Sequence, residues 1–153
     1  MDINAYLRRI DYKGSLNPEL TVLETLQKQH LFTVPFENLD IHYNRLIELD
    51  IAKFYQKIVV ENRGGFCYEL NGLFRNLLDQ LGFKTKMVSA RVYNSETESF
   101  GPEYDHLAIV AEFEESAYLV DVGFGEFAMH PLLIEPQKIQ VDSRGEFVIE
   151  QVK

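Results

Sequence analysis

The sequence predicts an α+β fold, with a helical part at residues 1–83 followed by a β-rich part at residues 84–153. Apolar residues recur at helical spacing as far as Leu81, which predicts amphipathic helices. From Phe83 onward the chain is rich in β-forming residues, and polar turn signals divide it into short runs. Helices followed by strands are typical of α+β folds, and we expect the second part to form an antiparallel sheet or a partial, truncated β-barrel.

The first long helix is predicted to start at Asn17-Pro18-Glu19. These residues combine an N-cap residue, a proline at the first helical position and an acid in the first turn. Apolar residues then follow at a spacing of three from Leu20. Pro35 disfavours helical backbone at Val34, so the helix is expected to end there.

Two further helices are indicated by their end signals. Asp50 is a typical N-cap, and the helix after it is expected to end near Gly64-Gly65. A longer helix is predicted over residues 68–81, with leucines and Phe74 on one face, and Gly82 is expected to close it.

The β-rich part contains one predicted strand, one predicted hairpin and one further predicted turn. Residues 84–93 are rich in β-formers, and residues 106–113 and 117–122 flank a short acidic turn. A second turn at residues 142–145 separates KIQV from EFVI. Because neighbouring runs joined by a short turn pair antiparallel, we expect residues 106–113 and 117–122 to form a hairpin.

Charge and composition exclude several classes of partner. The 153-residue chain has a net charge of −9, whereas nucleic acids and anionic membranes require clustered Lys and Arg. No apolar run is long enough for a membrane span, and the start of the chain lacks the apolar region of a secretory signal. We therefore expect a cytoplasmic protein that binds neither nucleic acid nor membrane, and we expect no metal site.

Cys67, the only cysteine, lies where the Arg63-Gly64-Gly65 turn meets the predicted helix. The unpaired N–H groups of a helix start favour a thiolate and can stabilise an oxyanion beside it. The same position also suits a small buried apolar residue, because free cysteine is among the most buried residue types. The stretch is therefore compatible with a nucleophile and with a structural thiol.

A nucleophilic thiol needs a base, and the base needs an orienting acid. Among the histidines, His30 and His42 are expected to be solvated or capping groups and His130 a turn residue. His106 opens a β-rich run that would hold its ring rigidly. Alternatively, His106 is a structural histidine that is hydrogen-bonded at the start of a strand.

Asp121 is the favoured orienting acid because it stands between two valines, where a carboxylate is costly unless it is paired. If the two runs of the predicted hairpin pair antiparallel, His106 and Asp121 can lie side by side. An exposed edge-strand aspartate is the alternative for Asp121. Asp105 is a weaker candidate, since adjacent strand residues point to opposite faces.

Four segments in order resemble the arylamine N-acetyltransferase family. RGGFCYELN (residues 63–71), DHLAIV (105–110) and DVGFG (121–125) are similar to its three catalytic segments, and VPFENL (34–39) is similar to its N-terminal motif. The resemblance implies a papain-like or transglutaminase-like core with a Cys-His-Asp triad. The helical domain, residues 1–83, would carry Cys67, and the partial barrel domain, residues 84–153, would carry His106 and Asp121.

The implied activity is ping-pong transfer of an acetyl group from acetyl-CoA through Cys67 to an arylamine, hydrazine or hydroxylamine. The backbone N–H groups of Cys67 and Tyr68 would stabilise the oxyanion. Phe36, Phe124 and Gly125 would lie near the acceptor, although both aromatics also suit a core.

Arg63 and Glu37 would pair to brace the active-site loop; two unpaired surface charges are the other interpretation.

The resemblance fails at the end of the chain, where the family's third, C-terminal lid domain is expected to be missing. That absence and the acidic composition leave open a related cysteine acyltransferase, amide synthase or hydrolase that uses another donor, or an inert truncated fragment. A partial barrel would also leave an unpaired strand edge, which is open to homo-oligomer formation.

Overall fold

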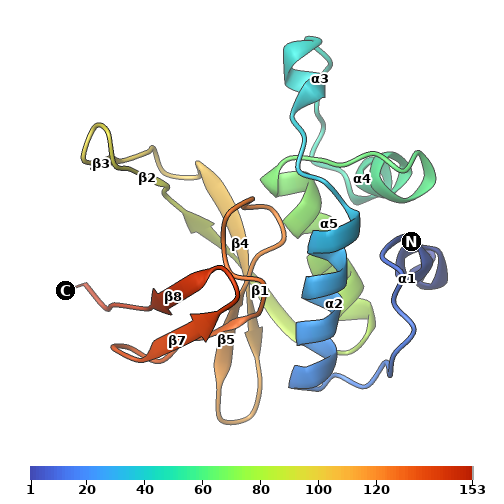
Figure 1. Cartoon of the computed structure of the whole chain (residues 1–153). Coiled ribbons are helices and arrows are strands. Elements are labelled where there is room, and N and C mark those ends of the chain that lie inside the picture. The colour runs from blue at the N-terminus through green and yellow to red at the C-terminus, as the bar shows by residue number, and fades with distance from the viewer. Residues whose placement is uncertain (153) are drawn as a thin grey trace.

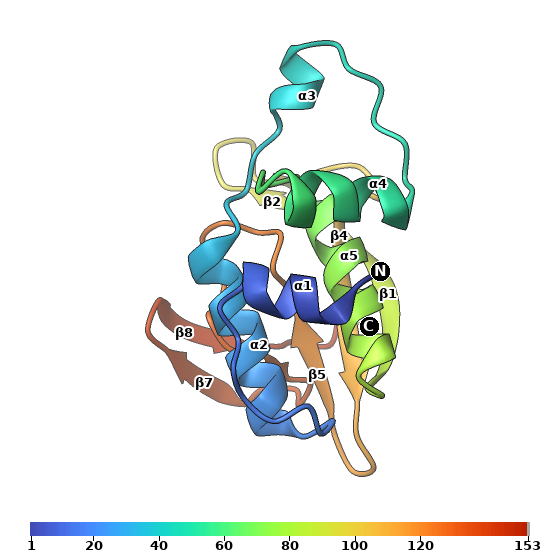
Figure 2. The ribbon, with the colours of Figure 1, turned by 90° about the vertical axis from the view of Figure 1, so that its right-hand side faces the viewer.

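The computed structural model describes residues 1–152 and separates helices from strands, as the sequence predicts. Figure 1 shows the helices gathered on one side of the molecule and most of the strands on the other. The helical elements are α1 (Ile3–Arg9), α2 (Leu20–Thr33), α3 (Leu39–His42), α4 (Ile51–Tyr55), the π-helical turn η1 (Gln56–Val60) and α5 (Cys67–Gln80). Figure 2 shows α3 projecting away from the other helices.

The strands form a four-stranded antiparallel sheet of order β1-β4-β5-β6 and two separate two-stranded pairs. The sheet contains β1 (Lys84–Ala90), β4 (His106–Glu112), β5 (Ala117–Val120) and β6 (Leu132–Leu133). The pairs are β2 (Tyr93–Asn94) with β3 (Ser99–Phe100), and β7 (Ile139–Asp142) with β8 (Gly145–Val148). The predicted β4–β5 hairpin is confirmed, and the segments on either side of the second predicted turn pair as β7–β8.

The expected barrel is not closed within residues 1–152. Strands β1 and β6 lie at opposite edges of the four-stranded sheet, and the strands of the β7–β8 hairpin pair only with each other. The predicted strand over residues 84–93 also breaks after Ala90, and the chain resumes as β2 at Tyr93.

Helix α5 is the element that joins the two parts of the chain. It packs against β4 and β1 on one side and against α4 on another. One cluster of buried apolar side chains includes Leu70 and Phe74 of α5, Ile109 of β4 and Val120 of β5. The core thus spans the predicted domain boundary at residue 83, and the division into domains stays a prediction.

The end signals predicted most helix boundaries near the site. Asp50 caps α4 as expected, accepting hydrogen bonds from the N–H groups of Ala52 (2.7 Å) and Lys53 (3.1 Å). Gly82 follows α5 with a φ of 91°, a conformation that glycine adopts without strain. Val34, before Pro35, ends α2 in extended backbone.

Two predicted boundaries are wrong. Helix α2 begins at Leu20 rather than at Pro18, because Glu19 keeps an extended backbone (φ −112°, ψ 154°). The segment after α4 ends at Val60 rather than near Gly64-Gly65, and Asn62 takes a φ of 54°, which no helix allows.

His30 is fully buried, which contradicts the expectation of a solvated or capping group. Its ring contacts Tyr6 and Phe74 edge-on, with ring centroids 6.0 Å and 5.3 Å apart. Helix α1, which supplies Tyr6, was missed by the sequence patterns, because seven residues are too few to show a reliable period.

Candidate functional site

The loop before Cys67 is held by the segment at residues 35–37. Phe36 forms a parallel bridge with Gly65, the Glu37 N–H donates to the Gly65 carbonyl (2.9 Å), and the Gly65 N–H donates to the Pro35 carbonyl (3.3 Å). A Cβ at Gly64 would lie 1.9 Å from the Pro35 carbonyl oxygen. Only glycine fits at this close approach, so the pair of glycines sets the path of the chain into α5.

Cys67 is the first residue of α5 and is 8% exposed. The Leu70 N–H donates to the Phe66 carbonyl (3.0 Å) and starts the helical hydrogen-bond ladder. The N–H groups of Cys67 and Tyr68 precede that ladder and therefore have no acceptor within the helix. The thiol lies beside backbone donors, as the sequence predicted from a helix start.

His106 and Asp121 are brought together at the end of the β4–β5 hairpin. His106 Nε2 lies 2.6 Å from Asp121 Oδ2, and both side chains are buried. The register pairs Ile109 with Val120, and its continuation places Asp121 opposite Ala108. The His106–Asp121 contact therefore runs diagonally between the two arms of the hairpin, a separation that a long side chain can span.

Asn71 holds Asp121 in place, a role that no motif in the sequence predicted. Its side-chain amide nitrogen donates to Asp121 Oδ1 (2.8 Å) and to the Leu107 carbonyl (2.6 Å), while its oxygen accepts from the Val122 N–H (2.9 Å). Asn71 lies four residues after Cys67, one turn further along α5. That spacing was the one signal in the sequence that could have revealed it.

Gly123 allows the loop after β5 to pack directly on Cys67. A Cβ at Gly123 would lie 2.7 Å from Cys67 Cα and 2.8 Å from Asn71 Nδ2. The Gly123 N–H also donates to Asp121 Oδ1 (2.8 Å). The absence of a side chain here brings the thiol-bearing helix and the Asp121 loop into contact.

The His106 imidazole is held in its charged form. Burial favours the neutral ring, but hydrogen bonds and charge interactions with Asp121 and Cys67 outweigh it and raise the pKa of His106 to about 9. The resting imidazole is therefore protonated at neutral pH. With Nε2 facing Asp121, Nδ1 is the ring nitrogen left for another partner.

The three residues predicted to lie near the acceptor substrate have different surroundings. The Phe124 ring stands edge-on to the His106 imidazole, with centroids 5.3 Å apart, and also contacts Phe127. Phe36 is half exposed and is linked to the site through its backbone bridge to Gly65. A Cβ at Gly125 would meet no atom within 4 Å, so the space beside that residue is open.

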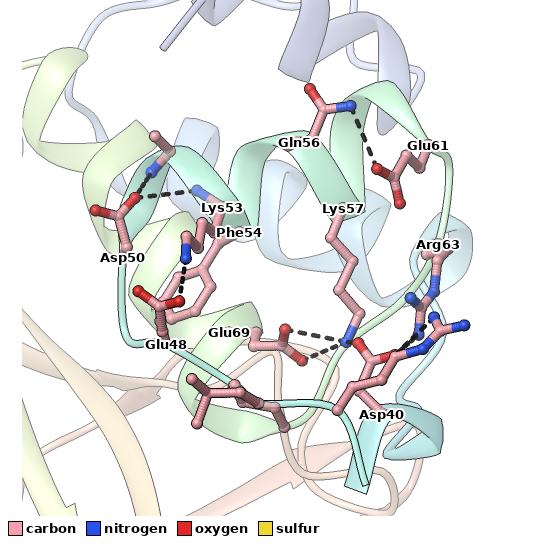
Figure 3. A pocket seen from close by; sticks show the side chains of 14 residues that line it. Asp40, Glu48, Asp50, Lys53, Phe54, Gln56, Lys57, Glu61, Arg63 and Glu69 are labelled. Carbon is pink, nitrogen blue, oxygen red and sulfur yellow. Dashed lines mark hydrogen bonds and ion pairs between the residues drawn. The ribbon is translucent and has the colours of Figure 1, made fainter. Parts of the chain in front are cut away.

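Arg63 and Glu37 contact each other, with Arg63 Nη2 2.8 Å from Glu37 Oε1. They belong to a larger group that we call the charged cluster: Glu37, Asp40, Lys57, Arg63 and Glu69. Figure 3 shows four of these five side chains converging below η1.

The charged cluster borders the hollow drawn in Figure 3, which measures about 480 Å³. Asp40, Lys57, Arg63 and Glu69 line it, whereas Cys67, His106 and Asp121 do not. Within residues 1–152, no group of three or more His, Cys, Asp and Glu side chains is placed to hold a metal ion. No helix in this part of the chain has the length and apolar character to cross a membrane.

Comparison with known proteins identifies the family. A family model described as N-acetyltransferase matches residues 19–153. The arylamine N-acetyltransferase of the pineal gland in Gallus gallus, isozyme NAT-3, is 42% identical over 126 residues, which cover 82% of this chain and 43% of the relative. The chain belongs to the arylamine N-acetyltransferase family.

Solved arylamine N-acetyltransferases share its fold. The enzyme from M. tuberculosis superimposes with a TM-score of 0.92 at 35% identity, covering 99% of this chain and 58% of that one. The enzyme from Mycobacterium marinum, solved in complex with CoA, superimposes with a TM-score of 0.84 at 33% identity, covering 92% and 53%. This arylamine N-acetyltransferase chain spans about half the length of the curated relatives it matches.

Proposed function

We propose that this chain transfers an acetyl group from acetyl-CoA to an arylamine, hydrazine or hydroxylamine through a thioester on Cys67. The observation that carries the proposal is the buried His106–Asp121 contact of 2.6 Å, and the Cys67 thiol is among the groups that raise the pKa of His106. Membership in the arylamine N-acetyltransferase family supports the reaction class. The CoA complex of the Mycobacterium marinum relative supports the donor.

In the first half-reaction the Cys67 thiolate attacks the thioester carbonyl carbon of acetyl-CoA. The new C–S bond to Cys67 forms as the bond to the CoA sulfur breaks, and the departing CoA thiolate takes the proton from the His106 imidazolium. A pKa of about 9 keeps that proton on His106 at neutral pH. Asp121, acting through Nε2, fixes the ring so that Nδ1 faces the reacting atoms.

In the second half-reaction the amine nitrogen attacks the acetyl carbon and loses a proton to His106. The C–S bond to Cys67 then breaks and the thiolate returns. Acetylation removes the negative charge of Cys67 that helps to raise the pKa of His106. The imidazole of the acetylated enzyme is therefore a free base nearer neutral pH, which suits general-base catalysis.

The backbone N–H groups of Cys67 and Tyr68 are the proposed oxyanion donors, because both precede the hydrogen-bond ladder of α5. Phe124 and Gly125 are proposed to border the acceptor: the first presents a ring beside His106, and the second leaves open space. Phe36 is proposed at the rim of the same site, through its bridge to Gly65. Arg63 and Glu37 are proposed to brace the loop before Cys67.

The same proposal interprets the fold as a papain-like or transglutaminase-like core. Residues 1–83 supply the thiol from a helix start, and residues 84–153 supply the histidine and aspartate from a sheet.

Intact-protein mass spectrometry tests the proposed function. Incubation with acetyl-CoA is expected to add one acetyl group to the wild-type chain and none to Cys67→Ala, and an arylamine is expected to remove it. No adduct on a thiol that alkylates rapidly at pH 6 would refute acetyl-CoA as the donor. Loss of the acetyl group to water at the same rate without amine would indicate a hydrolase instead.

A further inference from the structure

Lys57 is a buried cation at the centre of the charged cluster, and the proposed chemistry does not use it. Its ammonium lies 2.8 Å and 3.0 Å from the two carboxylate oxygens of Glu69, 2.9 Å from Asp40 and 3.4 Å from Glu37. Its side chain is 9% exposed. Figure 3 shows it reaching from η1 toward Glu69 and Asp40. Such burial is costly unless the charge is fully paired.

Glu69 connects this lysine to the start of α5. Its Oε2 accepts the N–H of Phe66 (3.1 Å), the residue before Cys67, while both of its oxygens accept from Lys57. The carboxylate therefore fixes the backbone immediately before Cys67 and places a negative charge in the first turn of the helix that Cys67 begins. A carboxylate near a thiolate disfavours the thiolate unless a cation compensates the carboxylate.

The charge count of the cluster shows what Lys57 compensates. Three carboxylates face two cations, Lys57 and Arg63, which leaves a net charge of −1. Arg45, 64% exposed, also reaches Asp40 from the solvent side. Removing Lys57 would leave three carboxylates with Arg63 alone, a net charge of −2.

We propose that Lys57 is a positioning residue for Cys67: it holds the Glu69 carboxylate against the first turn of α5 and cancels its charge beside the thiolate. The inference rests on the proposed nucleophilic role of Cys67. It concerns thiol reactivity alone, so it can be measured without CoA or amine.

Charged and titratable groups approach the thiol from several elements. His106 approaches from β4, with Asp121 behind it, and Tyr68 is its neighbour on α5. Glu69 lies two residues along α5 and is the group that Lys57 contacts most closely.

The other members of the charged cluster contact Lys57 or one another and lie outside the first turn of α5. Glu37 comes from the segment paired with Gly65, Asp40 from α3 and Arg63 from the loop before α5. Substitutions at Lys57 and Glu69 therefore change the charge at the first turn of α5 most directly.

The test is the pH profile of Cys67 alkylation by iodoacetamide, which is unambiguous because the chain has one cysteine. Lys57→Met keeps an unbranched side chain and removes the charge. We expect its rate to fall about tenfold at pH 6 and to converge within about twofold of the wild type at pH 9.5, because a compensating cation favours the thiolate most in acid. A merely loosened site would change the rate at both pH values.

Two rescue variants keep the test valid if Lys57→Met folds poorly. Lys57→Arg retains the charge, and Lys57→Met combined with Glu69→Gln returns the cluster to −1 while the glutamine oxygen can still accept the Phe66 N–H. Both are expected within about threefold of the wild-type rate at pH 6. Lys53→Met removes an exposed lysine from α4 and is the matched control, with less than a twofold effect expected.

A Lys57→Met profile that superimposes on a fast wild-type profile would overturn this inference and leave the proposed function standing. If the double variant does not recover the wild-type rate of Cys67 alkylation at pH 6, Lys57 does not act by charge compensation. A wild-type thiol that alkylates only at alkaline pH would overturn the proposed function and this inference together.

Discussion

Acid should destabilise this protein through His30, and substitution of that residue should remove the effect. His30 is fully buried, and neither ring nitrogen has a hydrogen-bond partner within residues 1–152. Burial, helped by the positive charge of Arg9, lowers its pKa from 6.5 to about 3. The folded state therefore binds a proton far more weakly than the unfolded state does.

The sign and size follow from linkage. Because the folded pKa is below the unfolded one, stability is complete above pH 6.5 and falls by about 1.4 kcal/mol per pH unit as the pH drops from 6.5 towards 3. Between pH 7.5 and 4.5 the loss due to His30 is about 3 kcal/mol. That is a large part of the 5–15 kcal/mol by which domains are typically stable.

The assay is urea unfolding followed by far-UV circular dichroism at pH 7.5, 6.5, 5.5 and 4.5, comparing the wild type with His30→Leu. Leucine fits the apolar surroundings and does not titrate. Carboxylates with lowered pKa values, such as Glu37 and Asp40, also lose stabilising interactions in acid, but they do so in both proteins. The difference between the two curves isolates His30. Curves that stay parallel within about 0.5 kcal/mol from pH 7.5 to 4.5 would refute the reasoning.

Three substitutions test the site itself. Gly123→Ala places a Cβ 2.7 Å from Cys67 Cα and should slow Cys67 alkylation at pH 6 at least ~10-fold, whereas Gly125→Ala, with nothing within 4 Å, should match the wild type. Equal rates in the two variants would contradict this. Asn71→Ala leaves the Leu107 carbonyl and the Val122 N–H without their partner and should cost about 2–4 kcal/mol in urea unfolding; a loss below ~1 kcal/mol would count against it. His106→Gln removes an imidazolium with a pKa of about 9 and should slow alkylation at pH 6 by about 100-fold, with the two rates converging above pH 9.5. A rate independent of this substitution would exclude an ion pair with Cys67.

Features with local signals could be predicted from the sequence. The Asp50 cap, the Gly82 stop, the β4–β5 hairpin and the turn between β7 and β8 each depend on residues within a few positions of one another. The resemblance of four short segments added the family, which the comparisons confirm. Pairing of His106 with Asp121 was within reach because both belong to one hairpin, whose register limits which residues can meet.

Features that depend on distant packing could not be predicted. The pattern of α2 places His30 near the end of a stripe, but the ring is enclosed by α1 and α5, which pack on the same core. The charged cluster joins residues from five segments, and nothing near Lys57 in the sequence identifies Glu69 or Asp40 as its partners. The extended backbone of Glu19 likewise overrides a start signal at Asn17-Pro18 that is favourable locally.

The periodicity of α5 explains how a single helix start serves two separate networks. At 3.6 residues per turn, Asn71 lies roughly 40° around the helix from Cys67, whereas Glu69 lies roughly 200° away. Asn71 thus faces the same side as the thiol and holds Asp121, while Glu69 faces the charged cluster and holds Phe66. Aligning the thiol with His106 and anchoring the loop before it are consequently independent tasks. Substitutions in one network should therefore combine nearly additively with substitutions in the other in the free energy of unfolding, and strong coupling between Asn71→Ala and Lys57→Met would show that the helix start does not separate them.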